Sequence, residues 1–196
     1  MTFWDLVAPF YNFFERFNRA YRKTIEQACV LVPKGASVLE LAAGTGNFSI
    51  AVSEKAGEVL CTDISDNMLK VARRRAKDRT NIEFAKASIF DTRMQANSYD
   101  VVIASQILHL LDEPGKAAKE IRRVAKDMAI LPMPLLKQSS RIGRFLIGLY
   151  KIVGFKPKHT FDEEGYKAFM ERIGFDGCEF YTVKGSVSIC TAVWRK

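Results

Sequence analysis

Two carboxylates, Glu40 and Asp63, stand where they could meet a nucleotide. Glu40 opens the stretch ELAAGTGNFS (residues 40–49), which follows an apolar run and carries a glycine turn before a predicted helix. A strand, a tight glycine turn and a helix together form a nucleotide-binding arrangement. Asp63 ends a second apolar run, VLCTD, 17 positions after Gly46. A carboxylate at that place can accept hydrogen bonds from both hydroxyls of a ribose, so Asp63 predicts an adenosine.

The glycine turn by itself matches a dinucleotide fingerprint only weakly, because Ser49 occupies the position of the third glycine. Glu40 at the strand end would repel a pyrophosphate, whereas it would attract a ligand that is positively charged there. S-adenosylmethionine carries an ammonium and a sulfonium beside its adenosine and has no phosphate. The two carboxylates therefore favour S-adenosylmethionine over NAD; the alternative is a helix-opening turn with an incidental acid.

The composition is that of an ordinary globular chain. Its 196 residues are 48% apolar and 27% charged, which suits one well-buried core. The net charge of +8 permits nucleic acid, an anionic membrane or an acidic ligand as partner and identifies none of them. The cysteines form no C-x-x-C pair, which favours reduced structural thiols in a cytoplasmic protein. Charged residues and a proline interrupt the aromatic N-terminus, so no membrane span or signal peptide is expected.

Hydrophobic periods alternate along the chain between strand and helix. Strands are predicted at 37–41, 58–63, 81–87, 99–105, 128–131, 178–184 and 187–194. Helices are predicted at 13–31, 114–124, 139–153 and 162–173. Two further helices are predicted to begin at residue 48 and at a cap formed by Asp66. We expect a single α/β domain over residues 1–196: a Rossmann-like seven-stranded sheet, mostly parallel with an antiparallel C-terminal hairpin, and helices on both faces. Residues 1–33 would form a helical cap, and 135–160 a helical insertion or lid after the fifth strand.

At this point the chain resembles the class I S-adenosylmethionine-dependent methyltransferases. The resemblance rests on four motifs in the family's order: VLELAAGTGNFS, LCTDISDNML, NSYDVVIASQILHLLDEP and GFDGCEFYTV. Within the family the chain is most similar to the small-molecule and lipid group, which includes quinone-ring and phosphatidylethanolamine methyltransferases. The resemblance implies methyl transfer from S-adenosylmethionine, with S-adenosylhomocysteine as product.

The resemblance also implies a set of cofactor contacts. Gly44 and Gly46 would contact the methionine part through their backbone, with Glu40 beneath it; Asp63 would bind the ribose, Ile64 and Met68 would cover the adenine, and the backbone carbonyl of Ser105 would meet the ammonium. Two departures from the family pattern are visible. Ser88 and Ile89 stand where an acid usually reaches the adenine amino group, and a neutral hydroxyl makes a weaker hydrogen bond there than a carboxylate. The usual Pro-Gly-Gly turn at the fifth strand is also missing.

Methyl transfer is an in-line displacement that needs positioning and exclusion of water, so no catalytic triad and no metal site are required. A phenol or carbon acid as acceptor would also need a general base. His109, in the loop after the fourth strand, is the candidate base, with packing of that loop as the alternative; His159 is a weaker candidate. Tyr11, near the N-terminus, could close over the cofactor or serve only in aromatic packing.

The acceptor is less constrained than the cofactor. The Asn/Asp-Pro-Pro-aromatic motif of base amino-methyltransferases is absent after the fourth strand, and no cysteine follows a proline. The run Arg73 to Arg75 is expected on a solvated outer face. These features argue against nucleic acid as the substrate. The insertion places an apolar stripe among cations. It could pack as a lid over a small-molecule pocket or lie on an anionic bilayer, giving a membrane-peripheral protein. We expect a small apolar or lipid-like acceptor; a non-catalytic cofactor-binding sensor or accessory subunit is the alternative.

Overall fold

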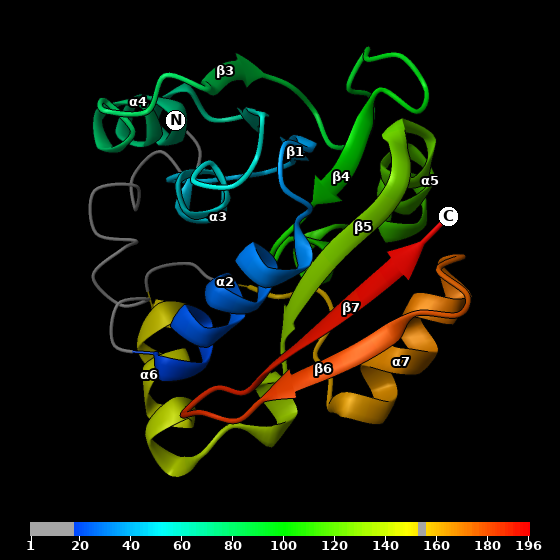
Figure 1. Cartoon of the computed structure of the whole chain (residues 1–196). Coiled ribbons are helices and arrows are strands. Elements are labelled where there is room, and N and C mark those ends of the chain that lie inside the picture. The colour runs from blue at the N-terminus through cyan, green and yellow to red at the C-terminus, as the bar shows by residue number, and fades with distance from the viewer. Residues whose placement is uncertain (1–17, 153–155) are drawn as a thin grey trace.

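The computed structural model describes residues 18–152 and 156–196. Within them, seven strands form one sheet in the order β3-β2-β1-β4-β5-β7-β6 (Figure 1). The strands are β1 (Ser37–Glu40), β2 (Glu58–Asp63), β3 (Ile82–Lys86), β4 (Tyr99–Ile103), β5 (Ala125–Pro134), β6 (Glu179–Val183) and β7 (Ile189–Arg195). The predicted Rossmann-like sheet is confirmed.

The chain changes direction across the sheet between β1 and β4. Strand β1 pairs in parallel with β2 on one side and with β4 on the other. The connections that leave the carboxyl ends of β1 and β4 therefore lead toward opposite edges of the sheet. In open α/β sheets ligands bind in the crevice at this point. Strand β7 pairs antiparallel with both β5 and β6, which confirms the C-terminal hairpin. The fifth strand is longer than the predicted 128–131, because its pairing with β7 continues to Pro134.

Helices cover both faces of the sheet, as predicted. They are α2 (Arg19–Leu31), α3 (Asn47–Val52), α4 (Asp66–Arg75), α5 (Pro114–Val124), α6 (Arg141–Ile152) and α7 (Glu163–Arg172), with 3₁₀ turns η1 (Leu108–Leu110) and η2 (Leu136–Gln138). Successive residues of β4 alternate between two cores: Val101 and Ile103 pack with α2 and α3, and Val102 and Ala104 pack with α5 and α7. In Figure 1, α2 lies in front of the sheet and α5 and α7 lie behind it.

The ends of three helices show how local sequence sets the boundaries. Helix α5 begins at Pro114, as predicted, because a proline in the first turn loses no helical hydrogen bond. Helix α7 is capped by Asp162, whose carboxylate accepts from Gly165 N at 3.0 Å. The prediction that Asp66 caps α4 is wrong by one residue. Ser65 is the cap, since its hydroxyl accepts from Met68 N at 3.2 Å, and Asp66 is the first helical residue.

Helix α6 lies in the predicted insertion and exposes apolar side chains. Ile142 is 69% exposed and Phe145 is 67% exposed. The segment before the helix is held by the loop between β6 and β7, because Ser140 N donates to Ser186 O at 3.0 Å. Within the described part of the chain, no helix is long and apolar enough to cross a membrane.

Candidate functional site

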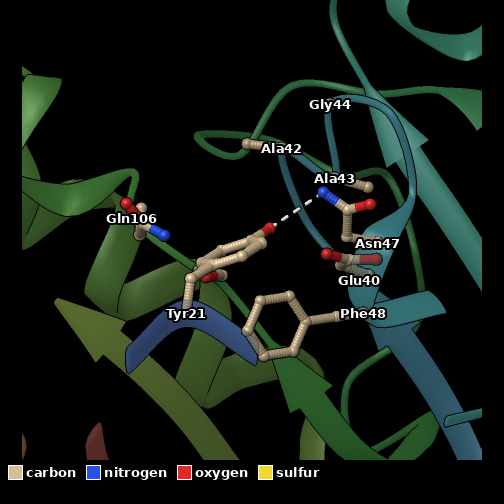
Figure 2. Close-up of a pocket in the computed structure, with 9 residues that line it drawn as sticks. Tyr21, Glu40, Ala42, Ala43, Gly44, Asn47, Phe48 and Gln106 are labelled. Atoms are coloured by element: carbon tan, nitrogen blue, oxygen red, sulfur yellow. Dashed lines mark hydrogen bonds between the residues drawn. The ribbon is translucent and has the colours of Figure 1, made fainter. Parts of the chain in front are cut away.

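A pocket lies at the carboxyl ends of β1 and β4, where the sheet order reverses (Figure 2). It encloses about 290 Å³ of empty space, part of it open to solvent. Its lining comes from α2, the glycine turn, the start of α3 and the end of β4: Tyr21, Glu40, Ala42, Ala43, Gly44, Asn47, Phe48, Ser105 and Gln106. The structure therefore brings three of the predicted cofactor residues, Glu40, Gly44 and Ser105, into one pocket.

Glu40 is the charged residue of this lining, and it is 2% exposed. Its Oε2 accepts from Ser49 N at 2.8 Å and from Ser49 Oγ at 2.5 Å. The backbone N–H of Ser49 belongs to the first turn of α3, where such groups stabilise a negative charge. Ser49, which weakens the dinucleotide match, thus orients the carboxylate beneath the glycine turn.

Asp63 fixes the same turn from the neighbouring strand. Its Oδ2 accepts from Gly44 N at 2.8 Å, and its Oδ1 accepts from Ser65 N at 2.8 Å. The carboxylate is 8% exposed at the end of β2. A carboxylate at the end of the second strand of such a sheet is the group that accepts from the hydroxyls of a ribose.

The backbone around the pocket is left-handed at several positions. The φ angles are 52° at Ala42, 55° at Gly44, 75° at Gly46 and 54° at Gln106. At Gly46 a Cβ atom would lie 3.1 Å from Ala72 Cβ, so this glycine lets the turn approach α4 closely. Ala42 and Gln106 carry side chains in a conformation that favours glycine, and such outliers concentrate at functional sites.

An aromatic wall that the sequence did not reveal closes one side of the pocket. Tyr21 of α2 accepts a hydrogen bond at its hydroxyl from Asn47 Nδ2 at 3.0 Å. Its ring meets that of Phe48 edge to face, with centroids 5.9 Å apart and planes at 84°. Figure 2 shows the Tyr21 ring between Asn47 and Gln106. The buried face of α2 has ordinary core spacing, so no sequence signal distinguished Tyr21 from packing residues.

Arg75 contacts the glycine turn instead of serving only as a solvated residue. Its Nη1 donates to Thr45 O at 2.7 Å and to Thr45 Oγ1 at 3.2 Å. Arg73 to Arg75 are exposed, as predicted for a solvated outer face, and Arg75 in addition bonds to the turn. This contact links the last turn of α4 to the turn between β1 and α3.

The residues predicted to meet the adenine lie beyond the pocket lining, around the end of β2. Ile64 follows Asp63 and is 63% exposed, whereas Met68 is buried in α4. Ser88 and Ile89 follow β3, which pairs with β2 up to Asp63. The Ser88 hydroxyl accepts from Phe90 N at 3.2 Å, and Ile89 is buried in the core on the side of α5. An exposed apolar side chain at Ile64 suits the face of a base.

His109 lies in η1 and is 2% exposed, outside the pocket lining. Its backbone carbonyl accepts from Lys158 N at 2.9 Å and His159 N at 3.1 Å, which joins η1 to the segment before α7. Burial, with a smaller effect of His159, lowers the pKa of His109 to about 3. The imidazole is therefore neutral at pH 7. Tyr11, the other predicted catalytic residue, lies outside the described residues.

The low pKa of His109 makes stability depend on pH. Because the histidine is neutral when folded and has an ordinary pKa near 6.5 when unfolded, the unfolded state binds the proton first as pH falls. The stabilisation is complete above pH 6.5 and is lost progressively toward pH 3, by up to about 1.4 kcal/mol per unit. Between pH 6.5 and 5 we expect the wild type to lose up to about 2 kcal/mol more than His109→Gln.

Urea unfolding of both proteins across that range measures the difference, with His159→Gln as the control that keeps His109. An equal pH dependence in wild type and His109→Gln would contradict the low pKa. The range stays above pH 4, where the carboxyls of Asp100 and Glu120, each with its pKa lowered to about 2, begin to contribute.

The pocket suits the cationic end of S-adenosylmethionine. Glu40 supplies negative charge, and the described lining includes no lysine or arginine that would oppose a cation. The hydroxyl of Ser105 is buried and makes no hydrogen bond to the residues that the structure describes, so a polar ligand atom could satisfy it. Those residues also contain no group of three or more His, Cys, Asp or Glu side chains able to hold a metal ion.

Comparisons with known proteins agree with this geometry. A family model described as a methyltransferase domain matches residues 39–131. A ubiquinone/menaquinone biosynthesis C-methyltransferase of Paraburkholderia phytofirmans is 31% identical over 199 residues, which cover 87% of this chain and 79% of that protein. A demethylmenaquinone methyltransferase of Staphylococcus carnosus is 26% identical over 194 residues, covering 87% of this chain and 80% of that protein.

The solved structures show the same fold. A S-adenosylmethionine-dependent methyltransferase of Thermotoga maritima, described as a possible histamine N-methyltransferase, aligns with a TM-score of 0.73 at 20% identity and covers 98% of this chain and 99% of that one. The glycine turn, the two carboxylates and the pocket residues Ser105 and Gln106 lie within residues 39–131, whereas Tyr21 precedes that region. The chain therefore belongs to the class I S-adenosylmethionine-dependent methyltransferases, near the ubiquinone/menaquinone group, and is an enzyme that uses S-adenosylmethionine as its cofactor.

Proposed function

We propose that this methyltransferase acts on an electron-rich, quinol-like ring. The observation that carries the proposal is the 31% identity, along 87% of the chain, to a C-methyltransferase of quinone biosynthesis. The pocket supports it, because the Tyr21 ring, packed edge to face on the buried Phe48, offers an apolar wall and Gln106 offers a neutral polar group beside it. A flat apolar acceptor with one or two oxygens would match that lining.

The cofactor would be held as the sequence predicts, with additions from the structure. We propose that Glu40, Gly44 and Ser105 hold the methionine part, and that Gly46 shapes the turn. Asp63 would accept from the ribose hydroxyls, with Ile64, Met68, Ser88 and Ile89 around the adenine. Tyr21 and Asn47, joined by their hydrogen bond, would close the methionine side against water.

When bound, S-adenosylmethionine supplies an electrophilic methyl group on a positively charged sulfur. The protein's own contribution is positioning and exclusion of water. Glu40 is fixed by Ser49 before any ligand arrives, so little reorganisation is needed to face a positive charge. An acceptor carbon that gains a methyl group must also lose its ring proton to a base. His109 is the candidate, although a pKa of about 3 makes it a weak base at neutral pH.

The test is methyl transfer from isotopically labelled S-adenosylmethionine to demethylmenaquinone with a short side chain, followed by mass spectrometry. We expect methylation of the reduced quinol and none of the oxidised quinone, because only the quinol has an electron-rich ring carbon. Phosphatidylethanolamine serves as the competing acceptor. Methylation of that lipid in place of the quinol would overturn the proposal.

Helix α6 is proposed as the surface by which the enzyme approaches membrane-held acceptors. Ile142 and Phe145 are exposed beside Arg141 and Arg144, which are also exposed. Exposed apolar side chains among cations suit the interface of an anionic bilayer. The same helix could instead act as a lid over a small-molecule pocket, the alternative that the sequence left open.

We expect Phe145→Ser to reduce co-sedimentation with vesicles rich in phosphatidylglycerol several-fold, because one exposed aromatic side chain no longer enters the interface. Binding of the wild type to the vesicles should weaken when salt is added, and it should also be weaker to vesicles of pure phosphatidylcholine. Val30→Ser is the matched control, since Val30 is an exposed apolar residue (76%) on a different helix, α2. Equal binding of wild type and Phe145→Ser, or an equal loss in Val30→Ser, would contradict the proposal.

A further inference from the structure

Gln106 has a strained backbone conformation just after the carboxyl end of β4. Its N–H donates to Pro132 O at 2.8 Å, just as Ala104 N donates to Ile130 O at 3.1 Å, so the pairing with β5 continues past the end of β4. The φ angle of 54° then turns the chain away toward η1. The backbone of Gln106 is thus fixed on its sheet side, and its side chain lies at the pocket.

The carboxamide of Gln106 has no partner within the part of the chain that the structure describes. It makes no hydrogen bond there, and it lines the pocket beside Ser105, whose hydroxyl is also without a described partner. In Figure 2 the Gln106 side chain stands next to the Tyr21 ring. Two neighbouring polar groups therefore face the pocket from the end of β4 without an internal hydrogen bond.

The strained backbone of Gln106 and its unpaired carboxamide both indicate a role in binding a ligand. A left-handed residue with a side chain is less stable than glycine at the same φ, and the turn itself would be made more easily by glycine. A glutamine here gains nothing from hydrogen bonds within the described protein. Strain that the local fold does not require indicates a group kept for its ligand.

We infer that the Gln106 carboxamide binds a ring oxygen of the methyl acceptor, with Ser105 Oγ as its neighbour. This inference rests on the proposed function. A carboxamide can donate to a carbonyl or phenolate oxygen and accept from a hydroxyl, which suits a quinol-like ring. The Tyr21 ring, backed by the buried Phe48, supplies the apolar wall beside it. Binding an oxygen at this point would set which ring carbon faces the methyl group.

The carboxylate of the cofactor's methionine is the competing ligand for the amide. A neutral amide is a weaker partner for a carboxylate than a charged donor would be. Only the NH₂ group of the amide can donate to a carboxylate, because the amide oxygen is an acceptor. The two ligands give opposite expectations: an acceptor contact changes turnover and leaves cofactor affinity intact, whereas a cofactor contact changes both.

Three variants separate the amide from the backbone strain. Gln106→Gly removes both, and Gln106→Met removes the amide while keeping a side chain of similar size at the left-handed position. Arg93→Gly is the matched control, because Arg93 has a φ of 59° and a side chain 90% exposed, outside the pocket. Each is measured for melting temperature, for S-adenosylhomocysteine affinity by calorimetry, and for kcat/KM with reduced demethylmenaquinone.

We expect kcat/KM to fall about tenfold in both Gln106 variants, mainly through KM, while S-adenosylhomocysteine affinity stays within about twofold of wild type. The two glycine variants should melt about 2–4 °C higher, and Arg93→Gly should keep wild-type kcat/KM. If both Gln106 variants kept the wild-type kcat/KM, the inference would be overturned and the proposed function would stand. The same would follow if the variants lost S-adenosylhomocysteine affinity in parallel with kcat/KM. Absence of wild-type turnover would overturn the proposed function and the inference with it.

Discussion

Asp63→Ala is expected to weaken S-adenosylhomocysteine binding about 150-fold, or about 3 kcal/mol, by titration calorimetry. Each hydrogen bond to a charged group contributes about 1.5–3 kcal/mol, and the carboxylate would lose two from the ribose. It also loses its 2.8 Å contacts to the backbone N–H groups of Gly44 and Ser65, so the glycine turn is less well fixed. NAD should give no heat with either protein.

Asp66→Ala is the control for loss of a nearby negative charge. Asp66 is three residues away, its side chain is 73% exposed, and it pairs with Lys86 at 2.6 Å. Exposed ion pairs contribute about 0–1 kcal/mol, so the affinity should barely change. Equal weakening in the two variants would mean that Asp63 acts through general charge and makes no specific contact with the ribose.

Glu40→Gln is expected to separate charge from shape at the floor of the pocket. The amide oxygen can still accept from Ser49 N, so the turn and the start of α3 keep their main contact. What disappears is one negative charge, worth on the order of 2 kcal/mol to a cation a few ångströms away in this setting. S-adenosylmethionine affinity should therefore fall about thirtyfold.

S-adenosylhomocysteine is the informative second ligand for this variant, because it keeps the ammonium and lacks the sulfonium charge. Its affinity should fall less than that of S-adenosylmethionine. Equal losses for the two ligands would place the influence of Glu40 on the ammonium alone. No loss for either would contradict the assignment of Glu40 to the cofactor and reduce it to a structural acceptor for Ser49.

Much of the candidate site could be predicted because its signals are local. The glycine turn, the acid at the end of β2 and the spacing between them depend on strand ends and tight turns, which a few neighbouring residues determine. The parallel sheet then brings those ends together, since carboxyl ends of adjacent parallel strands share one edge. Glu40, Gly44 and Ser105 line one pocket, and Gly44 meets Asp63 directly.

Other features followed from contacts between residues far apart in the sequence. Tyr21 has the spacing of a core residue, and its contacts with Asn47 and Phe48 place it at the pocket. Arg75 belongs to a basic run that suggests solvent, yet it reaches Thr45 across 30 positions. His109 is predicted in the loop after the fourth strand as a base or a packing residue; its burial lowers its pKa, and its backbone carbonyl bonds to Lys158 and His159, about 50 positions further along the chain.

The sequence by itself determined the class of fold, the helices around the sheet and the cofactor, because hydrophobic period and turn chemistry act over short distances. Tertiary structure decided that β7 lies between β5 and β6, lengthening β5 through pairing that no local pattern encodes. Tertiary structure also decided the left-handed backbone of Gln106, because the sequence has no glycine there to indicate a turn. Side-chain placement at the pocket depends on which strand ends and helices meet, and that is settled only when the whole sheet has formed.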